Sequence, residues 1–204
     1  MGGKRRITGL CLAAGVLAAV LAPAMAGAAR ESAGAAAAAS PAGRVFTLHS
    51  PDIAPGGTIG ASYVYDHSGC TGGNLSPALS WSHPPPGTRS FALLVFDSDV
   101  PEGGFWHWVV FDIPATVRSI RAGAGDPTKN LLPREATQTR NDYGFLGYGG
   151  PCPPSGSRHH YHFMLYALKV AKLGLDASAM PEQVDSRVTV EALGETEIVA
   201  VFAQ

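Results

Sequence analysis

The chain has 204 residues, 46% hydrophobic and 15% charged, which is enough for one domain with a sizeable buried core. Its 15 Lys and Arg residues stand against 16 Asp and Glu residues, so the formal net charge is −1. This balance, with no basic amphipathic helix in view, argues against a general nucleic-acid binder or a protein held on anionic membranes, because both need a basic face.

The first 26 residues are typical of a secretory signal peptide. Three basic residues precede an apolar run over residues 7–22, and Ala24-Met25-Ala26 forms an A-x-A cleavage site. The run is too short and too rich in Ala and Gly for a convincing membrane span, so we expect no stable membrane insertion. Cleavage after Ala26 removes three basic residues and no acidic one, leaving 12 basic and 16 acidic residues, a formal charge of −4.

Residues 27–43 are almost wholly Ala, Gly and Ser, which predicts a flexible linker ahead of one domain at 44–204. We therefore expect a secreted or periplasmic protein. Two cysteines, Cys70 and Cys152, lie in the exported part. In an oxidising compartment two cysteines most simply form a disulfide, and the alternative is two separate buried thiols.

Most of the domain is predicted to be β-structure, with turns rich in Gly, Pro, Asn and Ser between the strands. Strands are expected at 45–49, 58–65, 79–81, 89–97, 106–113, 161–170 (extending an alternating run at 158–164) and 197–203. The strands at 89–97 and 106–113 are apolar enough to be central and buried on both faces. Helical pieces are expected only within 174–193, one starting at Met180-Pro181 and a second at 188–193. Residues 118–141 form a long irregular segment, typical of a functional or well-packed surface loop.

Three segments at the ends of predicted strands could carry chemistry. Asp97-Ser98-Asp99-Val100-Pro101 places two acids on one side of an extended chain, although a plain strand-end turn has the same composition. Trp106-His107-Trp108 sets a histidine among tryptophans, where a buried core histidine is the alternative. Gly147 to Ser157 is rich in Gly and Pro, which predicts a stiff loop leading to His159.

In combination these segments resemble the phosphatidylethanolamine-binding protein (PEBP) family, and its bacterial Raf-kinase-inhibitor-like (YbhB/YbcL type) branch in particular. Residues 97–101 are similar to the family's D-P-D-x-P motif, and Gly150 to Pro154 with His159-His160-Tyr161 to its G-x-P-P…H-R-Y motif. The stretch from Cys70 to Trp81 and the sequence Asn141-Asp142-Tyr143-Gly144 also match. The resemblance covers essentially all of 44–204.

The resemblance implies a mostly β fold (α+β): a β-sandwich with a large central antiparallel sheet, a smaller second sheet and short C-terminal helices. It also implies a non-catalytic pocket at one edge of the sandwich. The ligand-binding residues carried over from the motifs are Asp97, Asp99, Pro101, Trp106, His107, Gly150, Pro153, Pro154, His159 and Tyr161. Two imidazoles, at least one of them protonated, together with loop amides could hold a phosphate or carboxylate. Asp97 is expected to accept a proton from one histidine, or to bind an ammonium headgroup.

Three departures from the family pattern stand out. Ser98 replaces a proline and makes the acidic turn less rigid. His160 replaces an arginine and, like His162, is expected to face away from the pocket because strand residues alternate. Glu191 stands where many relatives have histidine.

The expected partner is a small anionic ligand or a phospholipid headgroup, without a cofactor, metal or nucleic acid; a homodimer is left open. The alternative function is that of a protein–protein modulator such as a kinase or protease inhibitor. A phosphoester hydrolase is a weaker alternative, because no hydroxyl or thiol nucleophile is clearly placed beside Asp97, His107 and His159. A metal site is also a weak alternative. Adjacent residues of a strand point in opposite directions, so at most His160 and His162 could share an ion.

Overall fold

A computed structural model describes residues 44–204; the predicted signal peptide (1–26) and linker (27–43) lie outside the described residues. The strands are β1 (Thr47–His49), β2 (Leu79–Ser82), β3 (Ser90–Asp97), β4 (Phe105–Pro114), β5 (Ser119–Ile120), β6 (Thr137–Gln138), β7 (Arg158–Leu168) and β8 (Ala192–Ala203). Two short 3₁₀ helices, η1 (Ala61–Tyr63) and η2 (Pro127–Lys129), and one α-helix, α1 (Pro181–Glu191), complete the elements of this part of the chain.

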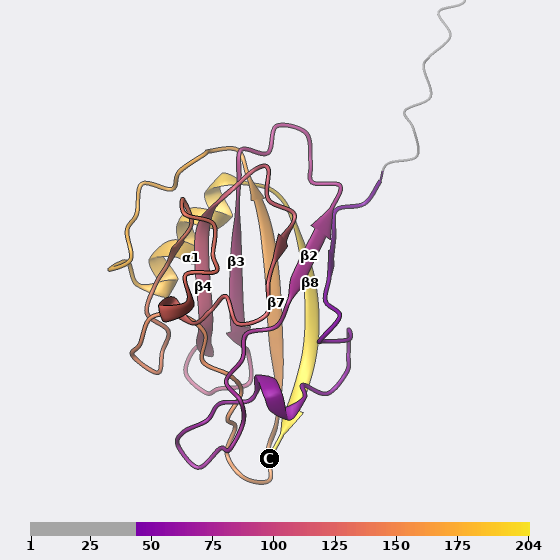
Figure 1. Cartoon of the computed structure of the whole chain (residues 1–204), viewed down its shortest axis with the longest axis vertical. Helices are drawn as coiled ribbons and strands as arrows, with labels where there is room; N and C mark the ends of the chain where they lie inside the picture. The colour runs from indigo at the N-terminus through magenta and orange to yellow at the C-terminus, as the bar shows by residue number, and fades with distance from the viewer. Residues whose placement is uncertain (1–43) are drawn as a thin grey trace, which may run out of the picture. The chain divides into compact units, whose positions relative to one another are not determined.

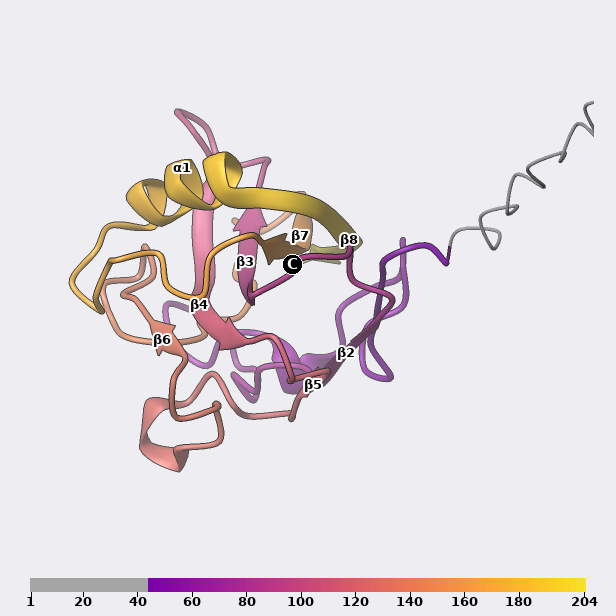
Figure 2. The ribbon, with the colours of Figure 1, turned by 90° about the horizontal axis from the view of Figure 1, so that it is seen from above.

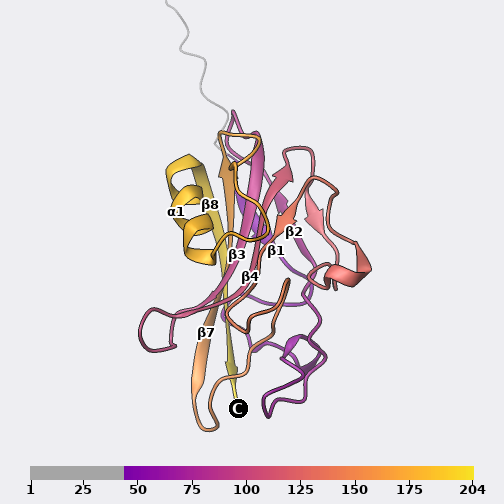
Figure 3. The same cartoon turned by 90° about the vertical axis from the view of Figure 1, so that its left-hand side faces the viewer.

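The strands form two antiparallel sheets. The large sheet has five strands in the order β6-β4-β3-β7-β8, and the small one has three in the order β1-β2-β5. Figures 1 and 3 show α1 on one face of the large sheet and the small sheet on the other, and Figure 2 shows the same layers from above. This arrangement confirms the predicted mostly β sandwich with a larger and a smaller sheet.

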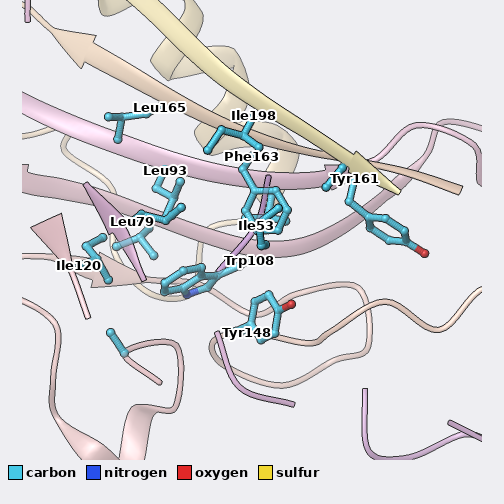
Figure 4. Close-up of a cluster of buried hydrophobic side chains, with 14 of the residues drawn as sticks. Ile53, Leu79, Leu93, Trp108, Ile120, Tyr148, Tyr161, Phe163, Leu165 and Ile198 are labelled. Atoms are coloured by element: carbon cyan, nitrogen blue, oxygen red, sulfur yellow. The ribbon is translucent and has the colours of Figure 1, made fainter. Parts of the chain in front are cut away.

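Each face of the large sheet buries its own apolar side chains. Between the two sheets, Leu79 and Ile120 of the small sheet pack with Leu93, Phe163 and Leu165 of the large one (Figure 4). On the other face a second cluster includes Leu94, Phe111, Val184 and Val188 under α1. Strands β3 and β4 are buried almost throughout, as their continuous apolar runs predicted.

One predicted strand is wrong. Residues 58–65 were expected to be extended, but only Thr58 makes a β-bridge, with Val201, and the chain then turns into η1. The amides of this segment bond to different neighbours: Ile59 to the Val201 carbonyl, and Tyr65 to the Pro151 carbonyl. The apolar, β-branched residues of this segment are therefore buried against two different neighbours, Val201 and Pro151, and do not form one continuous strand pairing.

The bounds of the C-terminal elements differ from those predicted from the sequence. The expected second helical piece at 188–193 does not exist, because α1 runs on to Glu191 and β8 already begins at Ala192. The early start of β8 follows from its pairing with the end of β7, where Leu168 lies opposite Ala192. The segment 118–141 is irregular apart from β5, η2 and β6.

None of the helices within 44–204 has the length and apolar content needed to cross a membrane. In the same residues no three His, Cys, Asp or Glu side chains are grouped as metal ligands.

Candidate ligand-binding site

The strand register brings three segments together at one end of the large sheet. Strand β3 runs antiparallel to both β4 and β7, so its last residue lies beside the first residues of its neighbours. Asp97 pairs with Phe105 on one side and with Tyr161 on the other. Residues far apart in sequence therefore lie in one row across the strand ends of the large sheet.

A β-bulge aims His107 into the same region. Val95 pairs with Trp108 and Phe96 with Trp106, so β4 has one extra residue, His107, at this step. The two tryptophans consequently face opposite sides of the sheet: Trp108 lies in the core between the sheets, and Trp106 lies in the core under α1. Bulges commonly re-aim a side chain next to a functional site, and this one turns His107 toward Tyr161.

The Gly/Pro loop is held by hydrogen bonds from several directions. Gly149 donates its amide N–H to the His107 carbonyl (2.9 Å), and Gly150 donates to Oδ1 of Asn74 (2.8 Å). The Pro151 carbonyl accepts from the Tyr65 amide (3.0 Å), and the Tyr143 hydroxyl donates to the Gly150 carbonyl (2.9 Å). The loop is fixed, as its composition predicted.

A close backbone approach and a disulfide reinforce it. A Cβ at Gly150 would collide with the backbone of the 63–65 segment, so only glycine lets the loop approach there. A disulfide joins Cys152 to Cys70, as the cysteine count predicted, and ties the loop to a turn 82 positions earlier in the sequence.

The three segments, together with Tyr143, line a small open pocket of about 200 Å³. Its lining residues are Asp97, Val100, Phe105, His107, Tyr143, Cys152, Pro153, Pro154, His159 and Tyr161. Aromatic rings form much of the wall: Phe105 and Tyr143 lie edge to face at 4.7 Å, and Tyr161 lies 5.2 Å from the His107 ring. Figure 4 shows Tyr161 at the margin of the core cluster with its hydroxyl pointing away from the aliphatic side chains.

An ion-pair geometry joins two of the buried polar residues of the pocket, Asp97 and His159. Oδ2 of Asp97 lies 2.7 Å from Nδ1 of His159, and both side chains are almost fully buried. The other carboxylate oxygen, Oδ1, accepts the Asp99 amide N–H at 2.9 Å. The carboxylate of Asp97 is thus occupied by protein donors, and Nε2 of His159 has no hydrogen-bond partner within residues 44–204.

His107 has a different electrostatic environment. Its side chain is fully buried, and this desolvation lowers the pKa of His107 to about 4 despite the nearby Gly149 carbonyl and Asp97 carboxylate. The neutral ring donates Nδ1–H to the Gly149 carbonyl at 2.6 Å, which leaves Nε2 as an acceptor. His107 is therefore uncharged at neutral pH.

The tyrosines of the pocket are protonated. Burial, and next the nearby Asp97 charge, raises the pKa of Tyr161 above its usual value. Burial likewise raises the pKa of Tyr143. Both side chains offer hydroxyl groups and no phenolate.

Six of the ten residues predicted for the site line this pocket: Asp97, His107, Pro153, Pro154, His159 and Tyr161. The other four lie around it. Asp99 binds His160, Pro101 is exposed in the turn, Trp106 faces the opposite side of the sheet, and Gly150 supports the loop. Hydrogen bonds from His160 lower the pKa of Asp99.

Four lining residues were not predicted: Val100, Phe105, Tyr143 and Cys152. Phe105 could have been found, because it begins the strand that carries His107. Tyr143 lies in the motif at 141–144, which matched the family but was given no place in the predicted pocket. Cys152 was predicted only as a disulfide partner.

The remaining histidines of β7 face outward, as predicted. His160 pairs with Asp99 at 2.8 Å and His162 with Glu197 at 2.6 Å, and neither lines the pocket. Glu191 lies at the end of α1 near Lys169 and Arg187, outside the pocket lining.

Comparison with known proteins agrees with this architecture. The family model described as phosphatidylethanolamine-binding protein matches residues 49–203. The Escherichia coli protein YbcL is 42% identical over 159 residues, which cover 77% of this chain and 87% of YbcL. LppC of Mycobacterium tuberculosis, a candidate lipoprotein, is 35% identical over 164 residues, or 80% of this chain and 75% of LppC.

Two solved structures share the fold. The crystal structure of Escherichia coli YbcL superimposes with a TM-score of 0.76 at 41% identity, covering 78% of this chain and 98% of that one. A phosphatidylethanolamine-binding protein homologue from Chlamydia trachomatis gives a TM-score of 0.65 at 29% identity, covering 78% and 97%. With a family model spanning nearly all described residues and relatives above 30% identity, the chain belongs to the phosphatidylethanolamine-binding protein family.

Proposed function

We propose that the pocket binds small anionic ligands, bearing a phosphate or a carboxylate, without chemical turnover. The observation that carries this proposal is the buried Asp97–His159 pair at 2.7 Å on the pocket wall, beside the fixed Pro153-Pro154 turn. A free phosphate and a phospholipid headgroup share this chemistry.

The pair explains how a site containing an aspartate can favour an anion. When His159 is protonated, Nδ1–H is donated to Asp97 and Nε2–H is left for the ligand. Asp97 thereby keeps the imidazolium in place, and the ligand meets a charge-assisted donor and not the carboxylate. At least one of the two imidazoles was expected to be cationic, and only His159 is left for that role in the proposal because burial keeps His107 neutral.

The size of the pocket limits the ligand. About 200 Å³ is below the range of roughly 300–1,000 Å³ typical of drug-sized ligands, so a headgroup-sized molecule fits and a lipid chain does not. Phe105 and Tyr143 provide apolar contact for its carbon atoms.

Binding without turnover is favoured by the chemistry of the lining. Its hydroxyl groups belong to Tyr143 and Tyr161, whose raised pKa values oppose formation of a nucleophilic phenolate. Its one sulfur, that of Cys152, is in a disulfide. The lining therefore offers no free thiol and no readily ionised hydroxyl as a nucleophile, and its one carboxylate, Asp97, is held by His159 and the Asp99 amide.

An extracytoplasmic location also belongs to the proposal. The Cys70–Cys152 disulfide is of a kind that persists in oxidising compartments, and the relative LppC carries a lipoprotein name. Both fit export of the chain by the signal peptide expected at 1–26.

The test is an NMR titration with phosphoethanolamine, inorganic phosphate and acetate. Replacing His159 by Ala is expected to reduce affinity about ten-fold or more, since a hydrogen bond to a charged group contributes about 1.5–3 kcal/mol. His159→Gln serves as a second variant should the alanine change disturb folding.

His160→Ala is the matched control, because His160 is the next residue of β7 and points the other way. Equal losses for the His159 and His160 variants would contradict the proposed site. Absence of shifts with all three ligands in the wild-type protein would overturn the binding function and favour the protein–protein modulator. A higher affinity for phosphoethanolamine than for inorganic phosphate would identify a headgroup as the source of the anion.

A further inference from the structure

A second polar constellation lies on the opposite face of the strands that build the pocket. Ser98 follows directly after β3 and is exposed. His162 is the residue after Tyr161 in β7, so the alternation of the strand turns it away from the pocket. Glu197 lies on the neighbouring strand β8, where it is directly opposite Met164.

The three side chains form a continuous hydrogen-bonded chain. Oγ of Ser98 lies 3.0 Å from Nε2 of His162, and Nδ1 of His162 lies 2.6 Å from Oε1 of Glu197. Because a carboxylate can only accept, Glu197 fixes the tautomer in which Nδ1 carries the proton. Nε2 is then a free lone pair that accepts the Ser98 hydroxyl proton.

This order of partners is the one that activates a serine. A hydroxyl bonded to an imidazole, which is in turn oriented by a carboxylate, defines a nucleophile, a general base and an orienting group. Distances of 3.0 and 2.6 Å place both contacts within the reach required for proton transfer. No residue of the constellation lines the ligand pocket, so its function is separate from anion binding.

A second serine–histidine contact lacks the carboxylate that would orient the histidine. Oγ of Ser82 lies 2.9 Å from Nδ1 of His83, and the same Oγ lies 2.8 Å from the hydroxyl of Thr47. His83 has no carboxylate partner among the ion pairs of residues 44–204. Ser82 is therefore a matched internal control for Ser98.

We propose that Ser98 is an activated nucleophile that accepts the acyl group of activated acyl donors such as aryl esters and thioesters. Oγ of Ser98 attacks the acyl carbon while Nε2 of His162 takes the hydroxyl proton, and Glu197 stabilises the resulting imidazolium. The bond to the leaving group then breaks, the phenol or thiol leaves with the proton from His162, and an acyl ester remains on Ser98.

The surroundings of Ser98 restrict the donor class. Its own amide N–H is donated to the His160 carbonyl (3.3 Å), and the following Asp99 amide is donated to Asp97 (2.9 Å). With these two amides engaged, neither is free to stabilise an oxyanion, an interaction that contributes about 10²–10³-fold to acyl-transfer rates in serine hydrolases. Ser98 thus requires donors with good leaving groups, and its acyl ester is expected to accumulate because hydrolysis meets the same barrier.

The experiment measures acetylation of the intact exported protein by p-nitrophenyl acetate. We expect a stoichiometric burst of p-nitrophenol and an acetyl group on the peptide containing Ser98, located by mass spectrometry. Ser98→Ala should remove both signals. His162→Gln should slow the burst about 10²-fold, as loss of a general base does, and Glu197→Gln should slow it by a smaller factor.

Ser82→Ala should leave the burst unchanged. All four variants change exposed or partly exposed side chains, and unaltered thermal unfolding will verify their folds. Acetylation of Ser82 as fast as Ser98, or a burst that His162→Gln and Glu197→Gln leave at the wild-type rate, would overturn the proposal. So would acetyl transfer to lysines or tyrosines with Ser98 unmodified.

Discussion

At the scale of single residues, two histidines of one pocket differ in environment because their partners differ. His107 is enclosed by aromatic rings and bonds a neutral carbonyl, whereas His159 bonds the carboxylate of Asp97. Both were predicted from the sequence to line the site, with at least one of them protonated and no indication of which. The distinction depends on desolvation, which follows from packing by residues distant in sequence.

The buried neutral state of His107 predicts a loss of stability in acid. Its pKa is about 4 in the folded protein and about 6.5 when unfolded. Between these values the unfolded chain binds the extra proton, so the free energy of unfolding falls as the pH falls. Above pH 6.5 the contribution is complete; full passage to pH 4 would cost about 3 kcal/mol at 1.36 kcal/mol per pH unit.

Urea unfolding of the wild-type protein and of His107→Gln at pH 7.5, 6, 5 and 4.5 measures this effect. The difference in unfolding free energy between the two proteins should shift in favour of the variant as the pH falls. A difference that stays constant with pH would show that His107 is protonated or accessible in the folded state. Comparing the two proteins cancels the titration of groups that they share.

At the scale of elements, the central strands could be predicted and their irregularities could not. Continuous apolar runs identified β3 and β4 with both faces buried. The bulge at His107 has no comparable signal, because a regular strand would place Trp106 and Trp108 on the same face. Its position is set by pairing with β3, which is information that one segment alone does not contain.

In the proline loop, the stiffness of the backbone is encoded by the loop's own residues. Its Gly and Pro content predicted a fixed backbone, and the hydrogen bonds to Asn74, Tyr65 and His107 are what fix it. These partners come from other segments, so the sequence could indicate stiffness and not the partners. Apart from Phe105, the unpredicted lining residues reflect the same limit, since the set of residues around a pocket is a property of the packed structure.

The disulfide predicts a large stability difference at this scale. Replacing both Cys70 and Cys152 by Ser should lower the free energy of unfolding by about 4 kcal/mol, because the closed loop of 82 positions no longer restricts the unfolded chain. Urea unfolding under non-reducing conditions measures it. A reducing agent should destabilise the wild-type protein by a similar amount and leave the double variant unaffected. Equal stability of the wild-type protein and the double variant would contradict the bond.

At the scale of the whole molecule, the large sheet separates the two sets of side chains to which we assign functions. Asp97, His159 and Tyr161 face the pocket on one side, and Ser98, His162 and Glu197 lie on the other. Alternation along β7 places His159 and Tyr161 on one face and His162 on the other. Ser98 stands where the family pattern has proline, which has no hydroxyl, so the nucleophile proposed for this chain cannot exist in relatives that keep that proline.

The sharing of one sheet by two cores predicts that the described domain unfolds as a single unit. Leu93 and Leu94 are neighbours in β3, both fully buried, yet Leu93 faces the small sheet and Leu94 faces α1. Each Leu→Ala change should cost about 2–5 kcal/mol through lost apolar burial and a residual cavity. In a domain of this size that lowers the Tm by roughly 10 °C.

Thermal unfolding followed by tryptophan fluorescence and far-UV circular dichroism tests this pair of variants. Trp106 lies in the core under α1 and Trp108 in the core between the sheets, so fluorescence reports on both faces. We expect coincident, single transitions for both variants, because β3 lies in the middle of the five-stranded sheet that supports both cores. If Leu94→Ala produced a separate early transition in the helical signal, α1 would be an independent unit, and its packing would not contribute to the stability of the pocket.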